Sequence, residues 1–394
     1  MQPLAGRTLY FVGIGGAGLS GYALLAHAWG ADVSGWDRYD TPYLEHLPPE
    51  VSVAVSDEPD PPAGAETIVS TAFAGRVDGR TRAEFLAELV SLQDSIVVAG
   101  AHGKTTTAAM IAFVLDRLGR DPGFLIGADV PQLGGNARAG GGWLVVEGDE
   151  SDRTIELLRP EIAVLTNVDL DHHTEFASRT EVEELFERWL AAAPRTVRGE
   201  SLEPYDGQLV LTGEHNRRNA ATALAALELA GVEGRKAWPV LREFRGAGRR
   251  LEEHGVARGV RVVDDYAHHP AEIAATLAAL REQGPGRILA LFQPHLYSRT
   301  RHLARETAEA LAAADVVAVT DVYAAREEPV AGVTGKLVVD ALAELRPGLV
   351  IGWTPRVEDG ARFVARQARA GDVVLTAGAG DVDRAAPLVL EELG

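Results

Sequence analysis

Two glycine-rich segments constrain the fold of this 394-residue chain more than any other feature of the sequence. The first, at residues 13–18, follows an apolar run and precedes a helical pattern at 17–29. The second, at 100–103, follows the apolar run 95–99 and precedes another helical pattern. A strand, a glycine-rich turn and a helix in this order form the phosphate-binding βα unit of nucleotide-binding folds. The two segments therefore predict two separate α/β domains.

Short apolar runs alternate with helical patterns through most of the chain. The runs predict strands at 8–13, 31–36, 67–71, 95–99, 143–147, 162–167, 260–264, 288–292, 316–321 and 373–376. The spacing of apolar residues predicts helices at 17–29, 104–118, 180–192, 217–230, 270–283, 301–314, 336–345 and 357–370. Nearly continuous apolar strands that alternate with helices are typical of parallel sheets covered on both faces. We therefore expect an α/β protein.

The chain is longer than one domain of ordinary size. Residues 244–248 contain two glycines and precede a fresh series of strands and helices, so we expect a domain boundary there. The polar stretch 194–205 predicts irregular structure. We place the boundaries at about residues 94 and 244, which gives domains at 1–94, 95–244 and 245–394.

The composition excludes several classes of protein. Lysine and arginine total 38, while aspartate and glutamate total 57, which gives a formal net charge of −19. A chain with this charge does not bind nucleic acid through its overall field. No apolar run reaches the roughly 18 residues of a membrane helix, and the N-terminus lacks a signal-peptide pattern, so we expect no membrane insertion. The absence of cysteine excludes disulfides and thiolate metal sites and fits a cytoplasmic protein.

The first glycine-rich segment predicts a diphosphate site. Gly13, Gly15, Gly16 and Gly18 let the backbone approach a pyrophosphate, whose charge the following helix N-terminus attracts. Asp37 ends the next apolar run, where it would meet a ribose hydroxyl. The segment alone does not distinguish NAD from a nucleotide sugar, and a tight structural turn is the simpler alternative. A Rossmann-type oxidoreductase would rest on this region alone and would leave the second segment unexplained.

The second glycine-rich segment predicts an ATP site. Loop amides would hold phosphates, Lys104 would reach the β- and γ-phosphates, and Thr105 would bind Mg²⁺. The spacing departs from the full P-loop pattern because Val98 stands at its first glycine position. The only lysines are Lys104, Lys236 and Lys336, so a lysine at this position favours a functional role over a capped helix with a solvated side chain. The predicted ATP contacts are Gly100, His102, Gly103, Lys104, Thr105 and Thr106.

Two acidic clusters follow the next predicted strands. Residues 147–152 contain four acids, and carboxylates beside a phosphate loop suit Mg²⁺. Residues 169–173 contain aspartates and histidines that would suit a second metal. Without the neighbouring ATP loop, each cluster would be an ordinary solvated turn.

Three later polar segments are candidates for ligand contacts. Residues 213–219 open a helix, and their polar side chains would suit the edge of an adenine. Residues 264–270 and 293–301 each lie between a strand and a helix, where open α/β sheets bind ligands. A capped helix start is the alternative in all three cases.

Taken together, these motifs resemble the Mur ligases of peptidoglycan synthesis. The sequences GIGGAG, AGAHGKTTT, EGDESD, TNVDLDHH, GEHNRRNA, GAGRR, DDYAHHP, FQPHLYSRTR and LTAGAGD occur in one order and cover nearly the whole chain. The likeness is greatest to the alanine-adding branch of that family. It implies a Rossmann-like N-terminal domain that binds a UDP-sugar, a central P-loop ATPase-type domain, and a Rossmann-like C-terminal domain that closes over the site.

The resemblance also implies roles for single residues. Contacts to the UDP-sugar would come from Gly13, Gly15, Gly16, Gly18, Asp37, Ser70 and Thr71. The first Mg²⁺ would be held by Thr105 and Glu147 and the second by His172, while His215 and Asn219 would contact adenine. Phosphates and carboxylated substrates would be met by Arg249, Asp265, His268, Arg299 and Arg301. The catalytic set would be Lys104, Glu147, His172, Arg249 and His268.

The implied reaction joins L-alanine to the lactyl carboxylate of UDP-N-acetylmuramate. ATP phosphorylates the carboxylate, and the amine then displaces phosphate from the acyl phosphate. Domain closure would exclude water, and arginines would grip the carboxylates through two hydrogen bonds. The resemblance thus implies ATP and Mg²⁺ as cofactors and a cytoplasmic monomer or homodimer.

Two positions bear on this assignment. Several Mur ligases place a carbamoylated lysine at the second metal, but Lys236 lies away from any metal-like motif, so we assign that metal to His172. Leu296 stands where the family more often has an arginine, so one contact to an anion is missing unless Arg299 or Arg301 supplies it.

The stretch between His173 and Gly213 is only about 40 residues long. It is considerably longer in the family, so we expect a shortened central domain. Two alternatives remain open at this point: a ligase that recycles a murein tripeptide, and a catalytically silent nucleotide-binding regulator of cell-wall synthesis.

Overall fold

The computed structural model describes residues 2–170, 175–284, 286–325 and 327–394. The chain forms two compact units. The first comprises residues 2–170, 178–210 and 218–247. The second comprises 175–177, 211–217 and the described part of 248–394.

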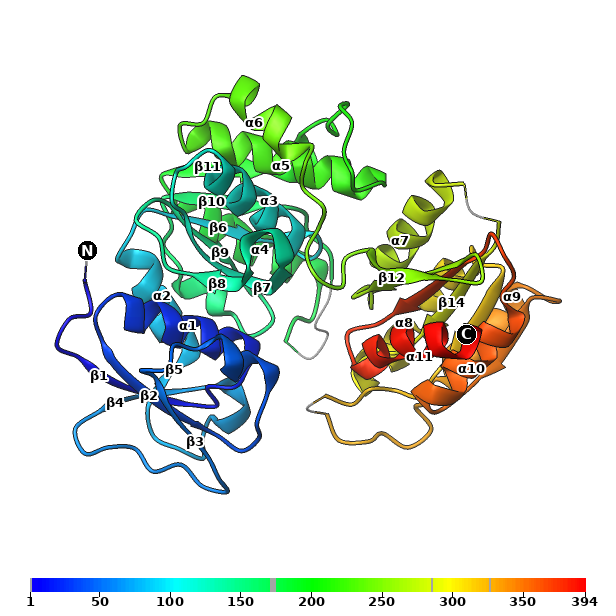
Figure 1. Cartoon of the computed structure of the whole chain (residues 1–394), viewed down its shortest axis with the longest axis horizontal. Helices are drawn as coiled ribbons and strands as arrows, with labels where there is room; N and C mark the ends of the chain where they lie inside the picture. The colour runs from blue at the N-terminus through cyan, green and yellow to red at the C-terminus, as the bar shows by residue number, and fades with distance from the viewer. Residues whose placement is uncertain (1, 171–174, 285, 326) are drawn as a thin grey trace. The chain divides into compact units, whose positions relative to one another are not determined.

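The first unit opens with a parallel sheet in the order β3-β2-β1-β4-β5 (Figure 1). Its strands are β1 (Thr8–Val12), β2 (Asp32–Asp37), β3 (Ser52–Val55), β4 (Glu66–Val69) and β5 (Arg80–Thr81), and its helices are α1 (Ala17–Ala28) and α2 (Arg82–Ser91). The middle strand β1 is apolar and buried along its last four residues. The loop that follows β1 therefore leaves the sheet at its centre.

The second sheet of this unit has the order β11-β10-β6-β9-β7-β8 and is parallel except for the pair β7 and β8. Its strands are β6 (Ser95–Ala99), β7 (Gly123–Val130), β8 (Gly135–Arg138), β9 (Leu144–Glu147), β10 (Ile162–Leu165) and β11 (Arg195–Arg198). The associated helices are α3 (Lys104–Arg117), α4 (Arg179–Ala191), α5 (Glu214–Leu229) and α6 (Gly234–Leu241). The first four residues of α5, 214–217, belong to the second unit. Helix α3 is buried from Thr105 to Leu115, which fixes the position of its N-terminus.

The second unit contains one sheet in the order β12-β13-β17-β14-β15-β16. Its strands are β12 (Glu252–Ala257), β13 (Val260–Asp265), β14 (Ile288–Phe292), β15 (Val316–Val319), β16 (Val350–Trp353) and β17 (Val373–Ala377), and all pairs except β12 and β13 are parallel. Its helices are α7 (Pro270–Glu282), α8 (Tyr297–Leu311), α9 (Lys336–Leu345), α10 (Val357–Gln367) and α11 (Ala385–Leu393).

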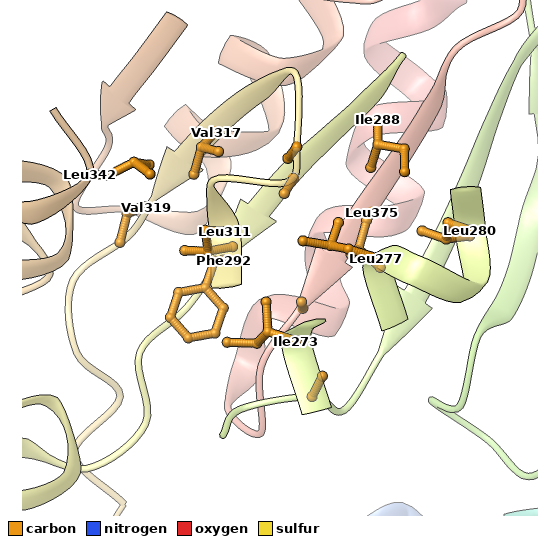
Figure 2. Close-up of a cluster of buried hydrophobic side chains, with 14 of the residues drawn as sticks. Ile273, Leu277, Leu280, Ile288, Phe292, Leu311, Val317, Val319, Leu342 and Leu375 are labelled. Atoms are coloured by element: carbon orange, nitrogen blue, oxygen red, sulfur yellow. The ribbon is translucent and has the colours of Figure 1, made fainter. Parts of the chain in front are cut away.

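Strand β14 shows why this sheet must be covered on both faces. Ile288 and Phe292 belong to a core cluster with residues of α7, α8 and α9, which Figure 2 shows. Leu289 and Leu291 belong to a second cluster with residues of α10 and α11. Because side chains alternate across a strand, a continuous apolar run needs helices on either side.

The expected α/β fold is confirmed, and most predicted strands and helices are present within a few residues. The prediction of irregular structure at 194–205 is wrong in part, because β11 lies there and pairs with β10. Strand β11 is at the edge of its sheet and buries only Val197, so its sequence carries no apolar run. Helix α8 also begins four residues before the expected position. The domain boundaries at 94 and 244 stay a prediction.

Residues 202–213 contain no helix or strand, and α5 begins immediately after them. Apart from the 3₁₀ helix at Gly199–Ser201, the segment between β11 and α5 is thus a plain connection. Among the residues that the structure describes, no helix is long and apolar enough to cross a membrane.

Candidate functional site

The central sheet brings three polar segments to one edge. Strands β10, β6 and β9 are parallel neighbours, so the segments that follow them leave the sheet on the same side. These segments are 166–170 after β10, 100–103 after β6 and 147–152 after β9. The carboxyl edge of a parallel sheet is where such folds bind ligands.

The glycine-rich loop after β6 is held in place by the segment after β10. Asn167 accepts a hydrogen bond from the His102 amide at 2.9 Å, and its side chain donates to the His102 carbonyl at 2.9 Å. Thr166 donates to the same carbonyl at 2.7 Å. A Cβ at Gly100, where φ is +128°, would lie 2.2 Å from Thr166 Oγ1. Glycine is therefore required at this position, and contacts within the protein hold the loop in place.

Lys104 is the first residue of α3, and its ammonium group lies among oxygen atoms. Nζ donates to the Gly100 carbonyl at 2.7 Å and lies 3.1 Å from both carboxylate oxygens of Glu150. The exposed fractions of the two side chains are only 17% and 5%. Burial lowers the pKa of Lys104, but Glu150, Asp149 and Glu147 outweigh this effect and raise the pKa above its ordinary value. Lys104 therefore keeps its positive charge beside the loop.

The two residues predicted to hold the first Mg²⁺ are in contact with each other. The Thr105 hydroxyl donates to Glu147 Oε1 at 3.0 Å, and the Gly127 amide donates to Glu147 Oε2 at 2.7 Å. A hydroxyl and a carboxylate are hard oxygen donors of the kind that Mg²⁺ prefers. These residues therefore fit the ion in their chemistry.

The predicted second metal ligand, His172, lies outside the described residues. Of the same acidic cluster, Asp169 is described, and its Oδ2 lies 3.5 Å from His102 Nε2. Lys236 lies near the start of α6 and is exposed. Its Nζ donates to Glu233 Oε1 at 3.0 Å. Its ammonium group thus forms a surface ion pair with Glu233.

The first glycine-rich segment connects β1 to α1. Asp37 accepts a hydrogen bond from the Gly15 amide at 2.8 Å, and the Thr41 hydroxyl donates to the Gly15 carbonyl at 2.7 Å. One oxygen of Asp37, predicted to meet a ribose, therefore holds the loop itself. Ser70 also adjoins this loop, because a Cβ at Gly13 would lie 2.5 Å from Ser70 Oγ. Gly16 is the N-cap of α1, and Gly18 is the second residue of that helix. Thr71 is exposed and is the first residue of a 3₁₀ helix.

Arg249 forms hydrogen bonds to the loop after β17 in the second unit. Its Nε donates to the buried Asp264 at 2.7 Å, and its two Nη atoms donate to the carbonyls of Gly378 and Gly380 at 2.7 and 3.1 Å. Burial lowers the pKa of Arg249, and Asp264 more than offsets this effect. All three nitrogens of the guanidinium thus have partners inside the protein.

Asp265 and His268 lie at the end of β13. The Asp265 carboxylate accepts amide hydrogen bonds from Leu251 at 2.8 Å and Ala267 at 2.9 Å, and burial raises its pKa to about 6. His268 Nδ1 lies 3.0 Å from the Tyr266 carbonyl oxygen. Both predicted residues therefore lie at the carboxyl edge of the sheet, with Asp265 held by backbone amides.

The aromatic rings of His268, His295 and Tyr323 form a row near the ends of β13, β14 and β15. The ring centroids of His268 and His295 lie 5.7 Å apart, and those of His295 and Tyr323 lie 5.9 Å apart. Arg299 is buried, with Nη1 3.0 Å from His295 Nδ1, whereas Arg301 is exposed. Residues two positions apart on a helix do not share a face. Only Arg299 of the predicted arginine pair therefore joins this row.

Leu296 precedes α8 with φ +70° and ψ 135°, a conformation that residues with a Cβ rarely adopt. Its amide donates to the Tyr323 carbonyl at 2.9 Å, and its carbonyl accepts from the Thr300 hydroxyl at 2.8 Å. Hydrogen bonds therefore set this backbone conformation. The guanidinium near the ring row comes from Arg299 and not from position 296.

Helix α5 carries the two residues predicted to contact adenine. His215 and Asn219 are one turn apart, so they share a face of the helix. A Cβ at Gly103, where φ is +79°, would lie 2.3 Å from Asn219 Oδ1, which places Asn219 against the ATP loop. Burial lowers the pKa of His215 to about 4.

Acidification is expected to destabilise the second unit through His215. The folded chain titrates this group near 4 and the unfolded chain near 6.5, so the unfolded state binds the proton first as pH falls. The stabilisation is complete above pH 6.5 and is lost by about pH 4, at most about 3 kcal/mol. Denaturant unfolding at several pH values should show this loss for the wild type and a flatter profile for His215→Asn. Equal pH dependence in both proteins would contradict the assignment.

Two side chains that hold the ATP loop and its lysine were not predicted from the sequence. Asn167 and Glu150 lie within quoted motifs, yet neither was singled out. An amide side chain directly after a strand that neighbours the ATP loop is the signal that points to Asn167. Nothing in the sequence indicates which acid of 147–152 pairs with Lys104.

Comparison with known proteins places these loops in one family. Residues 98–195 match the Mur ligase middle domain, and residues 249–380 match the Mur ligase glutamate ligase domain. A protein of Renibacterium salmoninarum named UDP-N-acetylmuramate--L-alanine ligase is 40% identical, over 98% of this chain and 96% of its own length. This chain belongs to the Mur ligase family. A Streptomyces coelicolor protein of the same name is 36% identical over 99% of this chain and 98% of its own length.

Solved structures of Mur ligases show the same fold. The UDP-N-acetylmuramate-alanine ligase of Thermotoga maritima superposes with a TM-score of 0.80 at 26% identity, over 98% of both chains. A murein peptide ligase of Psychrobacter arcticus shares the fold at a TM-score of 0.65 and 23% identity. The expected three-domain Mur ligase architecture is therefore confirmed.

This Mur ligase is shorter than its relatives. The alignment with the Renibacterium salmoninarum protein runs over 452 positions, although 98% of this chain is only about 386 residues. Roughly 66 positions of that relative thus have no counterpart here. The plain connection at 202–213 agrees with the expected shortening of the central domain.

Proposed function

We propose that this chain joins L-alanine to the lactyl carboxylate of UDP-N-acetylmuramate and converts ATP to ADP and phosphate. The observation that carries the proposal is the likeness, over nearly the full length of both chains, to ligases named for this reaction. The geometry of the ATP loop supports it, because Lys104, Thr105 and Glu147 converge at one sheet edge.

The loop after β6 binds the phosphates of ATP. Its backbone is held by Asn167, so little ordering is needed when the nucleotide arrives. Lys104 supplies a fixed positive charge that stabilises the negative charge developing on the transferred phosphoryl group. His215 and Asn219, one turn apart on α5, contact the adenine.

Thr105 and Glu147 would hold Mg²⁺, since both offer hard oxygen atoms and lie 3.0 Å apart. When bound, the ion neutralises phosphate charge. Glu147 is kept in position by the Gly127 amide, and Thr105 by its place in the first turn of the buried helix α3. The two side chains are thus oriented by the fold before the ion binds.

The chemistry proceeds in two displacements. An oxygen of the lactyl carboxylate attacks the γ-phosphorus of ATP, so an O–P bond forms and the bond to ADP breaks. The neutral amine of L-alanine then attacks the acyl carbon, the C–N bond forms, phosphate leaves, and the nitrogen loses its extra proton. The carboxylate of L-alanine suits a guanidinium, and Arg299 in the ring row is the residue we assign to it.

The three expected domains divide this work. Residues 1–94 bind the UDP-sugar through the loop at 13–18, residues 95–244 bind ATP, and residues 245–394 bind the amino acid and close over the site. The substrates ATP and a UDP-sugar place the reaction in the cytoplasm.

Phosphate release from ATP is the direct test. Purified protein with Mg²⁺ and UDP-N-acetylmuramate is expected to release phosphate with L-alanine, and to release little with glycine, with the murein tripeptide or with no amine. A matched reaction with UDP-N-acetylglucosamine, which lacks the lactyl carboxylate, should stay at background.

Each other outcome changes the assignment. Release with the tripeptide alone would make the chain a murein recycling ligase. ATP binding without release in any reaction would favour a catalytically silent regulator.

A further inference from the structure

Arg82 is an arginine that no motif of the sequence singled out. It is the first residue of α2, whose N-cap Thr81 forms a reciprocal capping box with Glu84. The cap fixes the backbone from which the Arg82 side chain extends. The side chain is only 21% exposed, although arginine is mostly exposed in proteins.

The Arg82 guanidinium connects two loops of the first unit. Its Nη2 lies 3.3 Å from Asp149 Oδ2 and its Nε lies 3.3 Å from Asp152 Oδ2, both in the segment after β9. Its Nη1 lies near Gly18, because a Cβ at this glycine would lie 3.5 Å from the atom. Gly18 is the second residue of α1, at the end of the first glycine-rich segment.

The Nη1 donors are the part of Arg82 that is still available. Among the residues that the structure describes, no hydrogen-bond acceptor contacts Nη1, while Nε and Nη2 both face carboxylates. A guanidinium offers five N–H donors in a planar fork that matches paired anionic oxygens. The free edge of this fork faces the first turn of α1, where the backbone N–H groups and helix dipole favour an anion.

We propose that Arg82 binds the diphosphate of the UDP-sugar through Nη1 while Nε and Nη2 remain on Asp149 and Asp152. The inference rests on the proposed function, since it takes a UDP-sugar as the occupant of the loop at 13–18. A local cation is needed there because the chain carries a net charge of −19, which repels an anionic substrate. Arg82 is thereby a substrate-binding residue that also touches the acidic loop beside the ATP site.

Calorimetric titration of UDP and of uridine tests this role. Arg82→Gln is expected to weaken UDP binding at least 10-fold and uridine binding less than 2-fold, because only UDP carries the diphosphate. Arg82→Lys should recover part of the UDP affinity, since it keeps the charge and loses the fork. ATP binding by both variants should stay within 2-fold of the wild type.

Arg80→Gln is the matched control. Arg80 lies two residues earlier and also pairs with carboxylates, Glu88 at 2.7 Å and Glu66 at 3.7 Å, but not with the loop after β9. Its replacement should leave UDP affinity unchanged.

The result that overturns the role of Arg82 is unchanged UDP affinity in Arg82→Gln, or an equal loss for UDP, uridine and ATP, which would indicate a general structural defect. A failure of the proposed function looks different: the wild type would bind ATP but no UDP. That result would remove the premise of the Arg82 assignment as well.

Discussion

Replacement of Lys104 by Met is expected to lower alanine-dependent phosphate release by roughly 100- to 1000-fold. The ammonium group is the fixed cation at the ATP loop, and methionine keeps the length of the side chain but removes the charge. Steady-state phosphate release at saturating UDP-N-acetylmuramate and L-alanine measures the effect.

The ion pair with Glu150 requires a second variant. Lys104→Met alone leaves a buried carboxylate without its partner, which costs about 3–5 kcal/mol of stability when such a pair is broken. The double variant Lys104→Met, Glu150→Gln removes both charges and should unfold closer to the wild type while remaining inactive. Lys236→Met is the control for loss of a surface lysine and should keep full activity. Substantial phosphate release by the folded double variant would reject the role of Lys104.

Replacement of Gly100 by Ala is expected to destabilise the first unit by roughly 2–5 kcal/mol and to weaken ATP binding more than 10-fold. The added Cβ would lie 2.2 Å from Thr166 Oγ1 and 2.8 Å from the Asn167 carbonyl oxygen. The backbone φ of +128° is strained for alanine even without these contacts. Thermal unfolding and calorimetric titration of ATP measure the two effects.

Gly119→Ala is the matched control for backbone strain. Gly119 has φ +68° and no atom within 4 Å of an added Cβ. Its replacement should cost about 1 kcal/mol, because only the backbone conformation is unfavourable. If Gly100→Ala costs no more than Gly119→Ala and still binds ATP normally, the close packing of the loop against 166–167 does not matter for its function.

Local sequence patterns predicted where the loops lie in the fold. Each of the loops at 13–18, 100–103 and 147–152 follows an apolar strand, and the carboxyl ends of parallel strands share one edge of a sheet. This rule was enough to bring Lys104, Thr105 and Glu147 into one place. It needs only the order of elements along the chain and the pairing of strands in parallel.

Contacts between distant segments could not be predicted in the same way. Asn167 holds the His102 backbone across 65 residues, and Arg82 reaches Asp149 across 67. Such contacts depend on rotamers and on how two sheets pack, and periodicity carries no information on either. Strand β11 was missed for a related reason, because an edge strand can form with one buried side chain.

The pair formed by Lys104 and Glu150 makes the affinity for ATP a difference between two interactions. The ammonium group lies 3.1 Å from both oxygens of the Glu150 carboxylate. Phosphate oxygens must therefore displace that carboxylate or share the cation with it, and the free energy of the internal contact is subtracted from the free energy of the new one. The Glu150 side chain therefore weakens the binding of the nucleotide and, by the same competition, favours the release of the product.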